Sequence, residues 1–191
     1  VGTGEKIIKI LKQNSIYLFD YVSNPEFLKQ GAAVEDFMRP DRIILGVNTE
    51  KAEKLMKELY APLVRNQNPI LVMDINSAEM VKYASNTFLA MKISYINKIA
   101  ELCEKTSADV SDVRLGMSAD TRIGTKFLYP GIGFGGSCFP KDIKALINMM
   151  KEKGINSEFI SQIEKINLER KNAFVQRILS RFNNNIKGRT F

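Results

Sequence analysis

The chain has 191 residues, of which 45% are hydrophobic, and it carries 28 Lys and Arg residues against 21 Asp and Glu residues, a net charge of +7. A chain of this length can bury a hydrophobic core and form one or two domains. Histidine is absent, which excludes Ser-His-Asp and Cys-His catalysis and most zinc sites, so that any chemistry must use cysteine, lysine, carboxylates or amides.

The positive charge is concentrated near the C-terminal end. Residues 165–191 hold seven Lys and Arg residues against one Glu, and the rest of the chain is nearly neutral. Because these basic residues lie among hydrophobic residues at helical spacing and form no recognised motif, they indicate a solvated helix face and no nucleic-acid partner. No hydrophobic run reaches the length of a membrane span, no signal-peptide pattern is present, and two cysteines make no disulfide framework. These features predict a cytoplasmic protein with no membrane partner.

Residues 1–75 alternate between helix and strand patterns. Periodicity predicts helices at 3–13 and 49–63, and Thr3 is expected to cap the first of them. Strands are expected at 16–22, 42–47 and 70–73, bounded by turn residues. Strands that alternate with helices indicate βαβ units and a parallel sheet. We therefore expect an α/β fold in which residues 1–75 form the C-terminal part of a doubly wound, Rossmann-like domain, whose first half lies upstream of Val1.

Residues 76–185 show helical patterns only. Asn76 begins a capping-box sequence, and hydrophobic residues recur at helical spacing from 77 to 105, which predicts one long helix as the spine of an all-α central domain. Further helices are expected at 109–116, 140–153 and 156–183. Cys103 falls on the hydrophobic stripe of the spine and is expected in the core. Residues 186–191 would begin a further domain.

A glycine-rich loop at 131–142 leads into the helix expected at 140–153. Four glycines within six residues allow the backbone to adopt positive φ angles and to approach a ligand closely. Cys138 follows them, at or just before the predicted helix N-terminus. The helix dipole and the Lys141 ammonium would stabilise a thiolate there, while Asp142 opposes them weakly. The loop indicates a reactive thiol, and a buried, inert cysteine is the open alternative.

Gly131, Gly133 and Gly136 also match the G-x-G-x-x-G pattern of dinucleotide-binding turns. That motif requires a hydrophobic strand directly before the first glycine, whereas this chain has Pro130 where the strand should end. The pattern alone is weak, and we disfavour the dinucleotide-binding interpretation of this loop.

Lys82 and Asn86 are four residues apart on the predicted spine helix and project from the same face. They are either a solvent-exposed pair or a pair of hydrogen-bond donors for a developing oxyanion. Their spacing alone does not decide between these interpretations.

Four segments, at 24–28, 80–90, 122–124 and 131–142, resemble the nucleotide-sugar 6-dehydrogenases in sequence and in order. They read Asn-Pro-Glu-Phe-Leu, Met-Val-Lys-Tyr-Ala-Ser-Asn-Thr-Phe-Leu-Ala, Arg-Ile-Gly and Gly-Ile-Gly-Phe-Gly-Gly-Ser-Cys-Phe-Pro-Lys-Asp. The resemblance covers essentially the whole chain and implies the end of an NAD-binding domain followed by a central helical domain. It implies NAD as cofactor, UDP-glucose as substrate with GDP-mannose as an alternative, and a homodimer formed through the long helix.

The resemblance also implies a role for each matching residue. Cys138 would be the nucleophile that forms a thiohemiacetal and then a thioester with C6 of the sugar. Lys82 and Asn86 would stabilise negative charge on the C6 oxygen. Glu26 would be the general base that directs water at the thioester, and Asp142 would position water or share in proton transfer. Residues implied to contact the substrate are Phe27, Leu28, Phe127, Leu128, Tyr129, Gly133, Gly135 and Arg122, the last in the partner subunit's site, and Glu26 and Lys141 would lie near the cofactor.

One position departs from the family pattern. Many members carry a second glutamate four residues after the first, where this chain has Gln30, so a general base at either position must here be Glu26. The family's upstream glycine fingerprint and downstream domain are not in the chain, and we expect the 191 residues alone to be inactive. Two interpretations from other classes stay open: a thiol redox protein that uses Cys138, and a non-catalytic dimer module.

Overall fold

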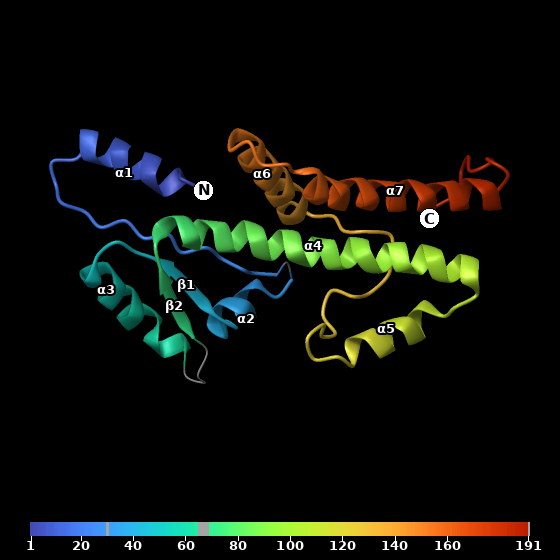
Figure 1. Ribbon diagram of the computed structural model, residues 1–191, viewed down its shortest axis with the longest axis horizontal. Coiled ribbons are helices and arrows are strands. Elements are labelled where there is room, and N and C mark those ends of the chain that lie inside the picture. The colour runs from blue at the N-terminus through green and yellow to red at the C-terminus, as the bar shows by residue number, and fades with distance from the viewer. Residues whose placement is uncertain (30, 65–68, 191) are drawn as a thin grey trace. The chain divides into compact units, whose positions relative to one another are not determined.

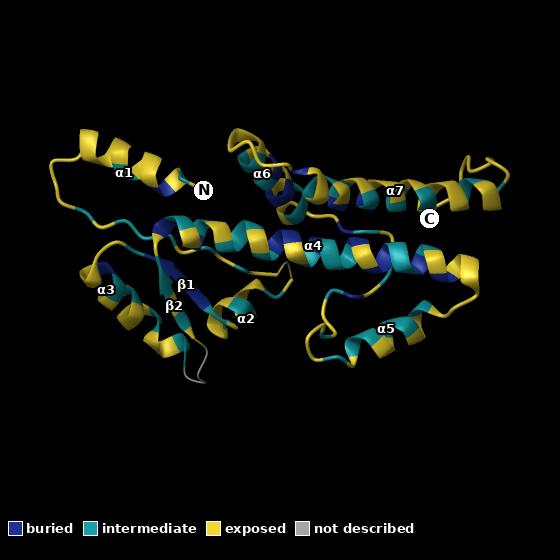
Figure 2. Ribbon diagram, viewed as in Figure 1, coloured by how far each residue is buried: buried dark blue, intermediate teal, exposed yellow. Residues whose placement is uncertain are grey.

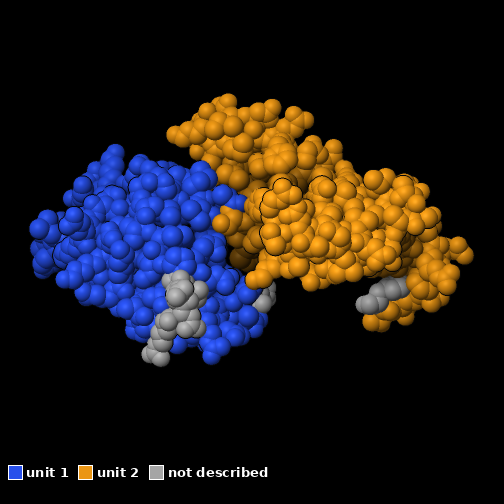
Figure 3. All heavy atoms as spheres, turned by 60° about the horizontal axis from the view of Figure 1, so that its bottom comes forward, with its two compact units in different colours: residues 1–84 blue, residues 85–191 orange. Residues whose placement is uncertain are grey.

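The computed structural model describes residues 1–29, 31–64 and 69–190 (Figure 1). The fold is mixed α/β and rich in helix, as the sequence predicts. The chain divides into two compact units, Val1–Ala84 and Ser85–Phe191, which Figure 3 draws in different colours. No helix in the described ranges is both long and apolar enough to cross a membrane.

The first unit contains a βαβ arrangement. Its elements are α1 (Thr3–Asn14), α2 (Ala33–Met38), β1 (Ile43–Gly46), α3 (Glu50–Tyr60), the short 3-10 helix η1 (Ala61–Leu63), β2 (Ile70–Met73) and the first turns of α4 (Ile75–Thr106). β1 and β2 pair in parallel, with Ile43 opposite Ile70. All of β1 is buried, and the Thr49 side chain caps α3 by accepting a hydrogen bond from the Ala52 N–H. The predictions for 42–73 are confirmed.

The predicted strand at 16–22 is wrong. This segment has no regular structure, and Ile16, Tyr17 and Leu18 are among the most exposed hydrophobic residues described. Ser23, just beyond it, bonds to the sheet through an antiparallel bridge to Gly46. Strand preference reflects side-chain packing more than backbone conformation, and no described element covers these side chains. The aromatic and β-branched pattern therefore had no sheet face to occupy.

The first turn of α4 rests on the end of β1. A Cβ atom on Gly46 would lie 2.6 Å from the Ala78 Cβ and 2.9 Å from the Ile75 Cα, distances that no side chain tolerates. Only glycine lets the helix approach the strand so closely. This contact sets where α4 begins.

The caps of α4 and α1 differ from the prediction. α4 begins two residues before the expected start, and the capping side chain is Asp74, whose carboxylate accepts the Ser77 N–H at 2.9 Å and the Ser77 hydroxyl at 2.6 Å. Glu79, the expected partner of an Asn76 cap, instead accepts the Gly4 N–H at 2.6 Å and the Thr3 N–H at 3.2 Å. Thr3 is therefore the first residue of α1 and does not cap it. A carboxylate distant in sequence therefore replaced the expected cap of α1, and the neighbouring Asp74 replaced that of α4.

The second unit is a helical bundle segment. It holds the rest of α4 together with α5 (Val110–Ser118), α6 (Cys138–Glu152) and α7 (Glu158–Arg181). Buried Ala90, Phe134, Ile143, Ile147 and Ile163 form its hydrophobic core. Figure 2 shows buried residues recurring along α4 between exposed ones. Cys103 is 5% exposed, as expected, and the predicted helices are confirmed with shifts of one to two residues at most of their ends.

We expect the replacement Asp74→Ala to destabilise the chain in a pH-dependent way. Hydrogen bonds from the Ser77 hydroxyl and then from the Ser77 N–H hold the pKa of the Asp74 carboxyl below its ordinary value. A carboxyl with a lowered folded-state pKa stabilises the fold at neutral pH, and that contribution is lost as the pH falls through the folded pKa. The variant should therefore melt at a lower Tm at neutral pH and approach the original chain in acid.

Thermal unfolding followed by circular dichroism at both pH values measures this effect. Glu58→Ala, which removes an exposed carboxylate from α3, is the control. An equal loss of Tm at both pH values would show that Asp74 does not act through its charged cap.

Candidate active site

The thiol of Cys138 is presented at the start of a helix. Cys138 is the first residue of α6 and is exposed, with its Sγ 3.8 Å from the Ser137 hydroxyl. Its position at the helix N-terminus confirms the sequence prediction. Its exposure contradicts the alternative in which Cys138 is buried, whereas Cys103 is buried. A thiol in this position lies at the helix end whose first N–H groups have no partner within the helix.

A buried carboxylate lies one helical turn beyond the thiol. Asp142 is fully buried, and its two oxygens have different partners. Oδ1 accepts a hydrogen bond from the Lys141 Nζ at 2.7 Å, and Oδ2 accepts one from the Asn86 Nδ2 at 2.6 Å. An ion in the interior requires such compensation. Asn86 is itself 8% exposed, so the interpretation of Asn86 as a solvent-exposed residue is wrong.

Lys82 and Glu26 form an ion pair within the first unit. The Lys82 Nζ donates to Glu26 Oε1 at 2.8 Å and also to the Glu26 backbone carbonyl. The other carboxylate oxygen of Glu26 accepts the Leu28 N–H at 2.7 Å. The Lys82 side chain is 16% exposed and that of Glu26 is 56% exposed. The ammonium is thus largely withdrawn from solvent and held by a carboxylate that solvent reaches.

Asn24 anchors the segment that carries Glu26. Its Nδ2 donates to the Ile44 carbonyl of β1 at 2.8 Å, and its Oδ1 accepts the Tyr60 hydroxyl at 2.5 Å. The Asn-Pro-Glu-Phe-Leu motif is therefore fixed to the sheet by its first residue. Because α4 also rests on β1, the same strand positions both members of the Lys82–Glu26 pair.

Phe27, a predicted substrate contact, packs against two cations. The Arg42 guanidinium carbon lies 4.1 Å from its ring centroid, and the Lys82 Nζ lies 5.4 Å from it. Both distances are within the range of cation–π attraction. The ring therefore helps to place Lys82, and the neighbouring Leu28 is 39% exposed.

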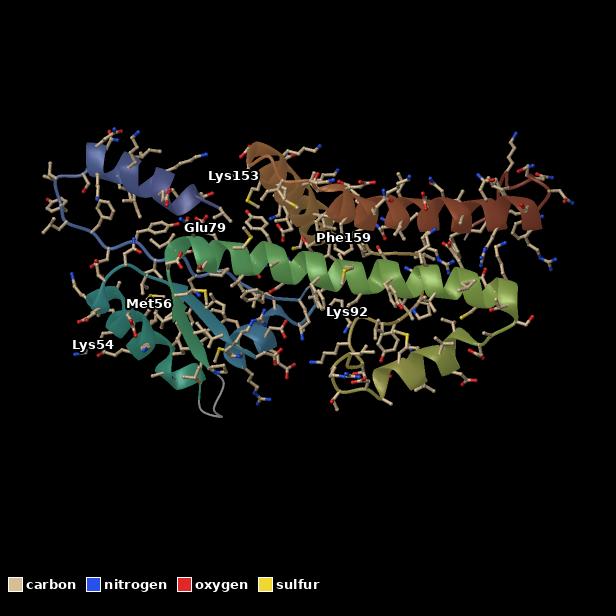
Figure 4. The ribbon with its side chains drawn as sticks, in the orientation of Figure 1. Lys54, Met56, Glu79, Lys92, Lys153 and Phe159 are labelled. Carbon is tan, nitrogen blue, oxygen red and sulfur yellow. The ribbon has the colours of Figure 1, made fainter. Side chains whose placement is uncertain are left out.

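The remaining predicted substrate contacts lie on the loop between α5 and α6. Arg122 is engaged by Asp120, with its Nε 3.0 Å from Oδ1, and the Arg122 side chain holds the pKa of the Asp120 carboxyl below its ordinary value. The Lys92 Nζ of α4, labelled in Figure 4, donates to the Ile123 carbonyl at 3.0 Å. The Tyr129 ring is exposed and lies against the Arg114 guanidinium at 4.5 Å.

Three further loop residues that were predicted to contact the substrate differ in packing and exposure. The Phe127 ring meets the Phe139 ring edge-on, with centroids 6.2 Å apart. The Leu128 side chain is only 2% exposed and serves as core. Gly135 is exposed, and a Cβ atom added to it would meet nothing within 4 Å. Gln30, where the chain departs from the family pattern, lies outside the described residues.

Sequence reasoning missed the side chains that hold the glycine loop. The Asn97 Oδ1 accepts the Gly131 N–H at 2.8 Å, and Asn167 bonds to both the N–H and the carbonyl of Phe134. Both asparagines are buried. The available signal was an asparagine among hydrophobic positions of a predicted helix, since a buried amide needs hydrogen-bond partners.

The described residues give no strand directly before the glycine loop, in the segment between α5 and α6. The loop at 131–136 therefore lacks the strand–turn–helix context of a dinucleotide-binding fingerprint. Among these residues there is also no group of three or more Cys, Asp and Glu placed to hold a metal ion.

The chain thus joins a βαβ unit, which is typical of nucleotide-binding proteins, to a helical unit that presents an exposed thiol. Two models of one family match it: the NAD binding domain of the UDP-glucose/GDP-mannose dehydrogenase family over residues 1–64, and the central domain over residues 76–169. The chain belongs to the UDP-glucose/GDP-mannose dehydrogenase family.

Individual relatives agree with this assignment. The UDP-glucose 6-dehydrogenase of Pseudomonas aeruginosa is 43% identical over 195 residues, which cover 100% of this chain and 43% of that protein. The UDP-glucose dehydrogenase structure from Pyrobaculum islandicum is 37% identical with a TM-score of 0.83, and the match covers 95% of this chain and 42% of that one. A UDP-D-ManNAc dehydrogenase from Pyrococcus horikoshii matches at 28% identity and a TM-score of 0.78, over 95% of this chain and 43% of that one. The chain spans less than half the length of these relatives.

We expect Asp142→Ala to lower the free energy of unfolding by about 1 to 3 kcal/mol, because the buried amide of Asn86 loses its acceptor. Adding Asn86→Ala to this variant should cost less than Asn86→Ala costs by itself, since the bond is already gone. Urea unfolding of the single and double variants measures both effects. As a control, Asp112→Ala, which removes an exposed carboxylate from α5, should change the free energy of unfolding little. If the losses of stability from Asn86→Ala and Asp142→Ala simply add in the double variant, a direct bond between the two side chains is contradicted.

Proposed function

We propose that this chain is the thiol-bearing part of an NAD-dependent UDP-glucose 6-dehydrogenase, which oxidises UDP-glucose to UDP-glucuronate in two two-electron steps. The observation that carries the proposal is the exposed thiol of Cys138 at a helix N-terminus, one turn from the buried Asp142–Asn86 pair. The names and identities of the relatives at more than 40% identity support UDP-glucose as the substrate.

Bound NAD would supply the oxidant in the whole protein, with one NAD molecule taking up one hydride in each of the two steps. The glycine loop at 131–136 lacks the context of a cradle for the NAD pyrophosphate, because no strand directly precedes it and Gly133 lies against the Asn167 amide, where an added Cβ atom would meet the Oδ1 at 2.5 Å. Glu26 and Lys141 remain the residues that we propose to lie near the cofactor. The contributions of this chain are therefore those of its own nucleophile, amide, ammonium and carboxylates.

Cys138 provides covalent capture of the intermediate aldehyde. Its thiolate adds to C6, forming a C–S bond and placing negative charge on the C6 oxygen. Loss of hydride from C6 of this thiohemiacetal gives a thioester, and attack by water breaks the C–S bond, releasing the carboxylic acid and the thiol. Capture keeps the aldehyde on the protein between the two oxidations.

The other groups act on charge and protons. Lys82 and the Asn86 amide are donors for the C6 oxyanion, and Glu26 takes a proton from the water that attacks the thioester. Both donors already have carboxylate partners, Glu26 and Asp142, which orient them before substrate arrives. Preoriented donors need little rearrangement during the reaction. Asp142 positions Asn86 and shares in proton transfer near the sulfur.

Three alternatives are weaker. GDP-mannose would use the same chemistry, and the family's name covers both substrates. A thiol redox protein would need a resolving cysteine, and Cys103 is buried. A non-catalytic dimer module leaves the Cys138, Asn86 and Asp142 arrangement without a role.

Two cysteines as free thiols fit a reducing compartment, and we place the protein in the cytoplasm.

The test is the yield of NADH from UDP-glucose with the whole protein that contains this chain. We expect two NADH per sugar, and Cys138→Ser should abolish release of the acid because no thioester forms. Cys103→Ser is the matched control and should retain the original stoichiometry. Release of acid at the normal rate by Cys138→Ser would refute the nucleophile assignment, and turnover of GDP-mannose alone would change the substrate. The 191-residue chain by itself should be inactive.

A second copy of the chain is the partner that the surface of α4 favours. Phe88, Tyr95 and Leu102 recur every seven residues, which places them along one face of the helix, and they are 57%, 50% and 57% exposed. An exposed hydrophobic stripe of this kind is typical of helix-to-helix association. We propose that the whole protein forms a homodimer through this face.

Replacing Leu102 and Phe88 with Lys should weaken the dimer, because two charges would enter the hydrophobic contact. Sedimentation of the whole protein over a range of concentrations measures the equilibrium. Leu115→Lys introduces the same charge at an equally exposed leucine of α5, 56% exposed, and should leave the dimer intact. A dimer that survives the α4 double variant would place the contact elsewhere.

A further inference from the structure

The backbone of the glycine loop is held at Gly131 from two helices. The Asn97 Oδ1 of α4 accepts the Gly131 N–H at 2.8 Å, and the Arg170 Nε of α7 donates to the Gly131 carbonyl at 2.8 Å. Asn97 is 1% exposed. Both hydrogen-bonding groups of this peptide position are therefore fixed by side chains far away in the sequence.

A second point of attachment lies three residues further on. The Asn167 Oδ1 accepts the Phe134 N–H at 2.8 Å, and the Asn167 Nδ2 donates to the Phe134 carbonyl at 3.0 Å. A single amide thus pairs with both backbone groups of one residue, as a neighbouring strand would. Asn167 is 6% exposed, and hydrogen bonds are strengthened where water is excluded.

Gly133 lies against the Asn167 amide, with no room for a side chain. Its φ angle is +108°, and a Cβ atom there would lie 2.5 Å from the Asn167 Oδ1. A side chain at this position would displace the amide from Phe134. Packing against Asn167 therefore requires glycine at position 133 whether or not a ligand binds to the loop.

The Phe134 side chain links this attachment to the thiol. The ring lies in the core with Ile143 and Ile163 and meets the Phe139 ring edge-on, with centroids 5.7 Å apart. Phe139 directly follows Cys138. Residues 135–138, between the two phenylalanines, are exposed, and a Cβ atom on Gly135 or Gly136 would meet nothing within 4 Å. The open stretch is short and fixed at both ends.

We propose that Asn97, Asn167 and Arg170 are positioning residues that hold the glycine loop so that its open stretch and Cys138 meet the nucleotide sugar in a single geometry. This inference rests on the proposed function and deepens it. Within the loop, all three side chains bond to backbone groups, so their effect on the reaction passes through the loop backbone. Displacement of reacting groups by about 1 Å costs on the order of 100-fold in rate, which is the scale of the expected effect.

The decisive variant is Asn167→Ala in the whole protein, with UDP-glucose as the varied substrate. We expect the KM for UDP-glucose to rise at least about tenfold and kcat/KM to fall about 100-fold. Asn172→Ala, the same substitution at an exposed asparagine of α7, should match the original protein in both constants. Rates are expressed per reactive Cys138, counted by iodoacetamide labelling of its peptide.

The KM separates positioning from mere support of the fold. A purely structural role would lower the number of reactive molecules and leave the KM unchanged, and that result would overturn the inference. Gly133→Ala should raise the KM by breaking the same contact, and the Gly133→Ala and Asn167→Ala effects should not add. Additive effects would mean that the two residues act separately and would also count against it.

Arg170→Ala keeps the test decisive if Asn167→Ala does not fold. This side chain lies nearer the surface. It donates to the Gly131 carbonyl, and its Nη1 also lies 4.0 Å from the Glu104 Oε1. We expect its KM for UDP-glucose to rise about threefold or more, and an unchanged KM would overturn the inference. If the original protein turns over neither UDP-glucose nor GDP-mannose, the proposed function fails and the inference fails with it; if the original is active and the variants match it, only the inference fails.

Discussion

The helical unit depends on how one buried charge is compensated. Asp142 lies within α6 at 0% exposure, and the amide of Asn86 on α4 is one of its two partners. Removing water from a carboxylate is expensive unless charged or polar groups replace it. Because Cys138 lies one turn before Asp142, this bond also fixes the first turn of α6 against α4. The requirement of the carboxylate for a partner is thus what orients the thiol.

Three buried polar side chains of α4 likewise need hydrogen-bond partners in place of water. Asn86, Ser94 and Asn97 are all buried on α4, and each bonds to a different part of the unit: α6, the Ile163 carbonyl of α7, and the glycine loop. A hydrophobic face alone would allow α4 to slide or rotate against its neighbours. Buried polar groups that are satisfied in only one arrangement exclude such alternatives. We regard α4 as the element that sets the register of the whole unit.

Local signals in the sequence were enough for most of the fold. The helices that follow Thr49 and Asp109, the two parallel strands and the position of Cys138 all follow from patterns within a few residues. The candidate site could not be built in this way. Lys82 and Asn86 find their carboxylates 56 residues away in opposite directions along the chain, and spacing on a helix cannot reveal such partners. The prediction of a strand at 16–22 failed for a related reason, because strand preference reflects packing and the side chains of Ile16, Tyr17 and Leu18 are exposed.

The cap of α1 has a consequence for synthesis on the ribosome. The first N–H groups of α1 are satisfied by Glu79, which follows Gly4 by 75 residues. A chain emerging N-terminus first at about 5 to 20 residues per second must wait roughly 4 to 15 seconds before that carboxylate exists. A short isolated helix is marginal in water. α1 is therefore the first helix of this stretch to be made, and it acquires its cap only after β1, α3 and β2 have been translated.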